Sequence, residues 1–220
     1  MIYELKDTSK AGVLFAGWQD SVVWSAMQGV MGKIYVDSPE KPESGAVMLG
    51  DFSFLSGKPS KEIVLWKPQE CDSQELILVP QNEDWAQLIE DCYGKRAQKT
   101  VRYAIKKEPG IFDLEKLQKV AAGLPQDYEM RLIDRELYEI CRSTKWSKDL
   151  TANYENYGQY EKFGLGVAIL KDGEVVAGIS SYSGYHGGIE IEVVTREDYR
   201  RKGLAYIGAA QLLLECDRRG

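Results

Sequence analysis

The chain has 220 residues, of which 44% are hydrophobic and 28% charged, so it is long enough for two domains that each bury a core. Its 34 acidic and 28 basic residues give a formal net charge of −6, which opposes non-specific attraction to nucleic acid or to an anionic membrane. No apolar run approaches the roughly 18 residues of a membrane helix, and residues 1–10 lack the apolar core of a secretory signal. We therefore expect a cytoplasmic protein with neither a nucleic-acid nor a membrane partner.

Cysteine and histidine usage limits the chemistry further. The four cysteines are widely spaced and form no C-x-x-C pair, which is typical of reduced thiols rather than of structural zinc or a disulfide framework. The single histidine, His186, lies in a glycine-rich stretch that is typical of a turn between strands. We therefore expect no metal site and no Ser-His-Asp triad.

The first half of the chain mixes helices and strands. Apolar spacing predicts a helix within residues 16–30, with Gly32 just past its end. Asn82 is a predicted N-cap of a helix that runs through Cys92 and closes near Gly94. Strands are predicted at 33–36, 46–55, 62–66, 75–79 and 100–105. The continuous apolar run of the fourth indicates burial on both faces.

The second half has a clearer pattern. A helix capped by Asp113 precedes the expected boundary between two domains, 1–125 and 126–220. A strand at 128–133 and helical patterns at 137–141 and 150–157 come next. They are followed by strands at 165–170, 175–182 and 189–195 and by a helix at 202–219. Asp172-Gly173 between the first two of these strands is a strong hairpin signal. This order predicts an α/β (α+β) fold with helices on a sheet.

One turn carries a binding motif. The strand 189–195 leads through a short loop into Arg200-Arg201-Lys202-Gly203-Leu204-Ala205 and then into a helix. A strand-to-helix turn of this kind directs free backbone N–H groups and the positive end of the helix dipole at one spot, which suits a pyrophosphate. The neighbouring cations and the small residues favour the same function. By itself R-x-x-G-x-A is a weak signal, and a solvated basic helix start fits it equally well.

R-x-x-G-x-A between a strand and a helix, with a three-strand meander upstream, resembles the GNAT superfamily of acyltransferases. Other stretches resemble a bacterial subfamily in which an N-terminal region precedes the acetyltransferase half. In the second half they are Asp172-Gly173-Glu174, Ser180-Ser181-Tyr182-Ser183, 188–192 and 199–205. In the first half they are 27–29, 79–82 and 102–107. The resemblance spans nearly the whole chain.

This resemblance implies a mixed sheet with flanking helices and acetyl-coenzyme A (acetyl-CoA) as co-substrate. It implies that the strand offers backbone partners to the pantetheine and the turn holds the phosphates, through Val193, Val194, Thr195, Arg200, Arg201, Lys202, Gly203, Leu204 and Ala205. On this resemblance, the first half is expected to be a degenerate duplicate of the same fold. It lacks the R-x-x-G-x-G/A motif and should not bind coenzyme A. The C-terminal half is expected to be incomplete, ending before the strand and helix that complete the family's fold. The acid that protonates the thiolate, a tyrosine in many relatives, is then unassigned.

Glu190 and Glu192 are the candidate bases. They are spaced i, i+2 and so share one face of the strand, where each carboxylate disfavours the charge of the other. Such a pair suits a base that works near neutral pH. Glu192 is favoured because it lies nearer the predicted acetyl position, and the alternative is a solvated strand face.

We expect an N-acetyltransferase that transfers the acetyl group directly from acetyl-CoA to a small amine. One alternative is an acyl-CoA-binding or regulatory module of the same fold without turnover. Another is a nucleotide- or phosphate-binding α/β protein. For the aromatic residues that precede the meander, packing is favoured over lining an acceptor pocket; these are Tyr154, Tyr157, Tyr160 and Phe163.

Overall fold

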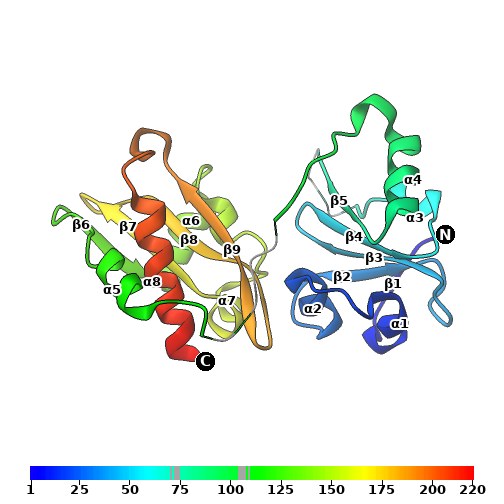
Figure 1. The fold of residues 1–220 in the computed structure, drawn as a ribbon, viewed down its shortest axis with the longest axis horizontal. Helices are drawn as coiled ribbons and strands as arrows, with labels where there is room; N and C mark the ends of the chain where they lie inside the picture. The colour runs from blue at the N-terminus through cyan, green and yellow to red at the C-terminus, as the bar shows by residue number, and fades with distance from the viewer. Residues whose placement is uncertain (70, 72–74, 104–107, 109) are drawn as a thin grey trace. The chain divides into compact units, whose positions relative to one another are not determined.

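The computed structural model describes residues 1–69, 71, 75–103, 108 and 110–220. They form two compact units, Met1–Ile105 and Lys106–Gly220, each built on one β-sheet with helices packed against it (Figure 1). The strand order is β1-β2-β3-β4-β5 in the first sheet and β6-β7-β8-β9 in the second. This α/β architecture agrees with the expected fold class.

The first unit follows the order strand, two helices, three strands, helix, strand, helix. Its elements are β1 (Tyr3–Leu5), α1 (Gly12–Phe15), α2 (Ser21–Met27), β2 (Lys33–Val36), β3 (Ser44–Leu49), β4 (Phe52–Gly57), α3 (Lys61–Leu65), β5 (Ile77–Pro80) and α4 (Glu83–Tyr93). Adjacent strands are antiparallel except β4 and β5, which are parallel. The core includes Trp85 of α4, whose indole N–H donates to the carbonyl of Gly57 at 2.9 Å.

Local signals predicted part of this unit correctly. The strand at 33–36 has the predicted bounds, and the side chain of Asn82 caps α4 by accepting the amide of Trp85. The single strand predicted at 46–55 is wrong. It is a hairpin, because Gly50 has a φ of +58° and reverses the chain between β3 and β4.

Three other predictions for this unit fail. The run 62–66 is helix α3, capped by Ser60, because a five-residue apolar run does not distinguish a strand from a helix. Strand β5 is half-buried along its whole length, since it is the last strand of its sheet and pairs there with β4. Residues 100–103 form no strand, and the rest of that predicted strand, 104 and 105, lies outside the described residues.

The second unit has a four-stranded antiparallel sheet. Its elements are α5 (Leu114–Ala121), β6 (Tyr128–Leu132), α6 (Arg135–Ser143), the 3-10 turn η3 (Lys148–Leu150), α7 (Tyr157–Phe163), β7 (Gly166–Lys171), β8 (Glu174–Tyr185), β9 (Gly188–Thr195), the 3-10 turn η4 (Glu197–Tyr199) and α8 (Leu204–Arg219). Helix α8 runs across one face of the sheet with α5 beside it (Figure 1). Strand β8 lies between two layers, because Ile179 faces α8 while Gly178 faces Leu150 of η3.

Most of the second-half predictions hold. Asp113 caps α5, and both Asp172 and Gly173 have positive φ, as a tight two-residue hairpin turn requires. The helix predicted at 150–157 is wrong, because η3 and irregular turns occupy that stretch and α7 starts only at Tyr157. Since α5 packs against α8, the second unit starts earlier in the chain than the boundary expected at 125/126.

Gly57 offers a test of the first unit. Its φ is +83°, and an added Cβ would overlap the carbonyl oxygen of Glu43. We expect Gly57→Ala to lower the free energy of unfolding by about 2 kcal/mol, through backbone strain and overpacking. Gly12→Ala is the matched control, because Gly12 has a helical φ of −53° and open space at its Cβ. Urea unfolding measures both, and equal stability of the two variants would contradict the packing described for Gly57.

Candidate functional site

Strand β9 has one open edge. Within the part of the chain that the structure describes, β8 is its neighbour in the sheet. The amide of Arg196 donates to the carbonyl of Val176 at 2.9 Å, so the hydrogen-bonded pairs further along are Gly178–Val194 and Ser180–Glu192. The backbone groups of Val193 and Thr195 therefore point away from β8. They form a ladder edge that an extended ligand could use.

The turn after β9 leads into the start of α8. Gly203 is the N-cap residue with a φ of +79°, and its carbonyl accepts the amide of Ile207 at 3.1 Å. No side chain among the described residues caps the helix. The amides of Leu204, Ala205 and Tyr206 therefore carry the partial positive charge of the helix end. An added Cβ on Gly203 would meet nothing within 4 Å, so the space in front of this turn is open.

Cationic side chains surround the turn. Arg200, Arg201 and Lys202 are all exposed, and Nε of Arg200 donates to the carbonyl of Thr195 at 3.3 Å, which ties the turn to the end of β9. The ammonium of Lys202 lies 4.3 Å from the ring centroid of Tyr199. These contacts hold positive charge beside the free amides of α8.

Arg196 organises the loop before the turn. Its guanidinium bonds both Asp198 and Glu174, with closest contacts of 2.9 Å, and lies 4.6 Å from the ring centroid of Tyr199. Hydrogen bonds to Asp198 and Glu174 raise the pKa of Arg196, and its bond to Asp198 lowers the pKa of that carboxyl. Arg196 thus neutralises the carboxylates of Asp198 and Glu174, whose negative charge would otherwise repel an anion near the turn.

The two carboxylates lie on the opposite face of β9 from α8. Ile189 and Ile191 pack in the core cluster that contains Leu212 of α8, so Glu190 and Glu192 point to the other face. Both are half-buried. Turn η3 packs against β8 and β9. The predicted pair therefore shares one face, as its spacing indicated.

Buried serine hydroxyl groups of β8 form hydrogen bonds with two tyrosines. Ser181 Oγ accepts hydrogen bonds from Tyr154 Oη at 2.6 Å and from the amide of Leu165 at 3.0 Å. Tyr160 Oη lies 2.9 Å from Ser180 Oγ. Burial raises the pKa of both tyrosines far above the usual range, so these phenols stay neutral and act as hydrogen-bonding groups.

Comparison with known proteins shows the family of this chain. The GNAT acetyltransferase family matches residues 13–220. The chain belongs to the GNAT acetyltransferase family. It is 25% identical over 211 residues to YdfB, described as an uncharacterised N-acetyltransferase, from Bacillus subtilis strain 168, covering 88% of this chain and 74% of that protein.

A solved structure agrees over almost the whole chain. It is a GCN5-related N-acetyltransferase-like protein from Streptococcus suis 89/1591, with a TM-score of 0.89 and 44% sequence identity. The match covers 98% of this chain and 86% of that chain. The family membership shows that the protein is an acyltransferase.

The structure brings most of the predicted coenzyme-binding residues of the GNAT motif to one place. The end of β9 and the turn 200–205 adjoin through the bond from Arg200 to Thr195. Val194 is an exception, because its backbone groups face β8. Leu204 contributes its amide alone, since its side chain is buried with Ile169 and Val176. A glycine is needed at position 203 because of its positive φ and not because of a lack of space, since an added Cβ would meet nothing within 4 Å.

Sequence reasoning missed Arg196 and the hydroxyl network. The spacing of Arg196 and Asp198 in one loop was a usable signal, since side chains two residues apart can pair there. The hydrogen-bond partners of Ser180 and Ser181 lie 16 to 27 residues away in the sequence, so no local sequence pattern predicts them. Packing of Tyr154 and Tyr160, favoured from the sequence, is confirmed by their burial. His186 lies in the turn between β8 and β9, as predicted.

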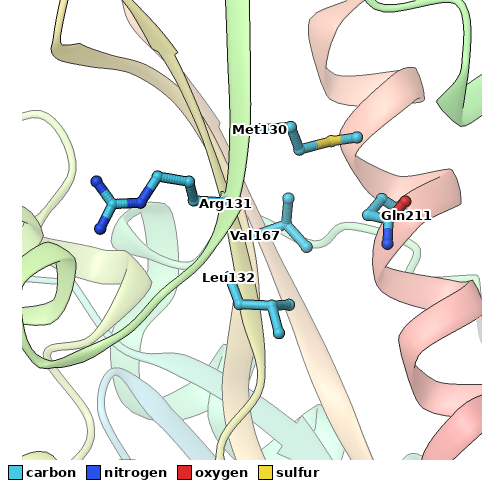
Figure 2. Close-up of a pocket in the computed structure, with 5 residues that line it drawn as sticks. All are labelled: Met130, Arg131, Leu132, Val167 and Gln211. Atoms are coloured by element: carbon cyan, nitrogen blue, oxygen red, sulfur yellow. The ribbon is translucent and has the colours of Figure 1, made fainter.

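Two cavities, of about 200 and 280 Å³, lie at the β6 side of the GNAT sheet. Figure 2 shows Met130, Val167 and Gln211 facing the space between β6 and α8, with Arg131 pointing the other way. Leu132 lines both cavities, and Tyr157 and Tyr160 line the larger one. None of the predicted coenzyme-binding or catalytic residues lines either cavity. The candidate site therefore rests on a strand edge and a helix end.

The described residues offer neither a candidate membrane span nor a candidate metal cluster. None of the helices there combines the length and apolar character that crossing a membrane requires. No group of three or more His, Cys, Asp or Glu side chains gathers in that part of the chain as a metal site would need.

The hydroxyl network has a measurable role in stability. Ser181→Ala should lower the free energy of unfolding by about 2 kcal/mol, because the Tyr154 hydroxyl and the Leu165 amide lose a buried partner. The control is Ser143→Ala, whose exposed hydroxyl bonds one helix carbonyl and should cost a few tenths of a kcal/mol. Denaturant melts compare the two, and a Ser181→Ala protein as stable as the control would refute this role.

Proposed function

We propose that this protein transfers an acetyl group from acetyl-CoA to a small amine by direct transfer. The observation that supports the proposal most is the continuity of the open edge of β9 with the uncapped start of α8. A linear ligand with an amide-containing arm and a pyrophosphate has matching groups along this path. The acceptor is proposed as an amine because carboxylates, which attract cations and accept protons, line the neighbouring face of β9.

The residues present fit the coenzyme. Backbone groups of Val193 and Thr195 would pair with the pantetheine amides, as an added strand would. The amides of Leu204 and Ala205 would bind the pyrophosphate, with Arg201 and Lys202 adding positive charge. Arg200 would hold the turn against Thr195. When bound, acetyl-CoA supplies a thioester, whose carbonyl carbon bonds the amine nitrogen as the C–S bond breaks and the thiol is released.

Glu192 is the proposed base. It is the residue before Val193, so its carboxylate lies beside the end of the path that the pantetheine would follow. A carboxylate within reach of the amine takes its proton as the C–N bond forms, which makes general base catalysis available at this position. Glu190 lies two residues further from the phosphate end, about 7 Å along the strand.

We also propose that the first unit is a second GNAT-like fold without a coenzyme site. Its order of strand, helices, three antiparallel strands and helix repeats that of the second unit. Where β9 is open, β4 is closed by β5: the amide of Gln81 donates to Leu55 at 3.1 Å, and its side chain accepts the amide of Gly57 at 3.0 Å. A pantetheine arm would have to break these bonds to pair with β4.

Gly203→Glu should weaken acetyl-CoA binding by about 100-fold while the protein stays folded, because the new carboxylate occupies the space in front of the phosphate-binding amides. Isothermal titration gives both the affinity and the stoichiometry, expected as one site per chain. Gly29→Glu is the control, since Gly29 also has a positive φ of +67° and open space at its Cβ. A folded Gly203→Glu protein that binds within a few-fold of wild type would rule out this phosphate site.

Glu192→Gln should lower kcat by about 100-fold and leave the Kd of acetyl-CoA within twofold, because the base acts on the amine and not on the coenzyme. Thiol release with a panel of primary amines measures turnover, and Glu190→Gln is the paired control that should keep its kcat. Full turnover by Glu192→Gln would remove Glu192 as the base. Tight coenzyme binding without thiol release by the wild type would instead favour the non-catalytic module.

A further inference from the structure

Ser183 has a buried hydroxyl that the fold does not satisfy. Its side chain is fully buried, and Oγ finds no hydrogen-bond partner among the described residues. A buried polar group without a partner costs free energy, so such groups are rare and call for an explanation. Since the Oγ atom is sealed from solvent, a ligand cannot reach it directly. A side chain on a facing residue that turns towards Oγ would satisfy it.

The register of the sheet identifies that neighbour. Ser183 of β8 lies directly opposite Glu190 of β9. Side chains of directly opposed residues project from the same face with Cβ atoms about 5 Å apart, so the Glu190 carboxylate can reach the hydroxyl. Burial and, secondarily, the charge of Glu190 raise the pKa of Tyr185, which places that carboxylate near the hairpin end.

The neighbouring residues Ser180 and Ser181 already have hydrogen-bond partners. Ser180, opposite Glu192, is paired with Tyr160, and Ser181 is held by Tyr154 and Leu165. A bulge at Tyr182 separates these two from Ser183, and Asn153 donates to the Tyr182 carbonyl at 3.1 Å. The bulge shifts the register by one residue and so places Ser183 against Glu190.

We propose that Ser183 is a positioning residue that donates a hydrogen bond to Glu190 and fixes that carboxylate to bind the cationic end of the amine acceptor. This rests on the proposed function. Along β9 the coenzyme path comes from the Thr195 end, so the acceptor approaches from the Glu190 end. Glu190 then holds the acceptor's ammonium, and Glu192 takes the proton from the reacting nitrogen.

The test uses the full chain with acetyl-CoA and the best of three primary amines that carry a second cationic group: putrescine, agmatine and spermidine. Ser183→Ala should lower the unfolding temperature less than Ser181→Ala does, because it removes one hydrogen bond to a half-buried carboxylate and leaves no fully buried partner unsatisfied. Its KM for the amine should rise about tenfold, the effect of one charge-assisted hydrogen bond, with kcat and the Kd of acetyl-CoA within twofold. In a Glu190→Gln background the same substitution should leave KM unchanged.

Each other outcome decides against the proposal. An unchanged KM in Ser183→Ala, or an equal rise in the Glu190→Gln background, removes Ser183 as a positioning residue. A loss of stability like that of Ser181→Ala makes Ser183 a structural residue. A wild type that binds acetyl-CoA but releases no thiol with any of the amines overturns the proposed function, and this inference with it.

Discussion

The antiparallel register between β8 and β9 determines the rest of the site. Because backbone groups alternate along a strand, one choice of register decides which of them bond β8 and which face outward. The same choice sends Ile189 and Ile191 to the core under α8 and the two glutamates to the other face. The unpaired backbone groups of Val193 and Thr195 and the acidic face are therefore two results of a single pairing. A slip by one residue would exchange them and bury the carboxylates.

Sequence patterns predicted the elements whose signals are local. Asn82 and Asp113 as caps, the Asp172-Gly173 turn and the glycine-containing turn before α8 each act within a few residues, so each could be recognised. Failures occurred where the deciding contact is distant or the run is short, as for α3 and the β3–β4 hairpin. Within the site, the motif and the shared face of the glutamates could be predicted. The bulge at Tyr182 could not, since it depends on pairing with β9 and on Asn153.

The two units differ at the same point of a shared order of elements. In the first, β5 pairs with β4 and Trp85 of α4 bonds the carbonyl of Gly57, so the outer edge of β4 is used inside the fold. In the second, the corresponding edge of β9 pairs with no strand among the described residues and lies next to the start of α8. An edge that completes a sheet adds stability, whereas an edge left open is available for recognition and for unwanted strand pairing. The same arrangement of strands thus completes a sheet in one unit and is proposed to bind the coenzyme in the other.

Leu204 combines a role in the core with a place at the start of α8. Its side chain is buried with Ile169, Val176 and Ala177, while its amide belongs to the open start of α8. The binding of an anion to that amide would therefore depend on the packing of the core. Binding of the anion and unfolding of the second unit would then be coupled equilibria. A substitution at Ile169 that lets Leu204 shift would change the affinity for the anion without touching it. Substitutions in the buried core of this sheet can therefore change the affinity for an anion at the start of α8.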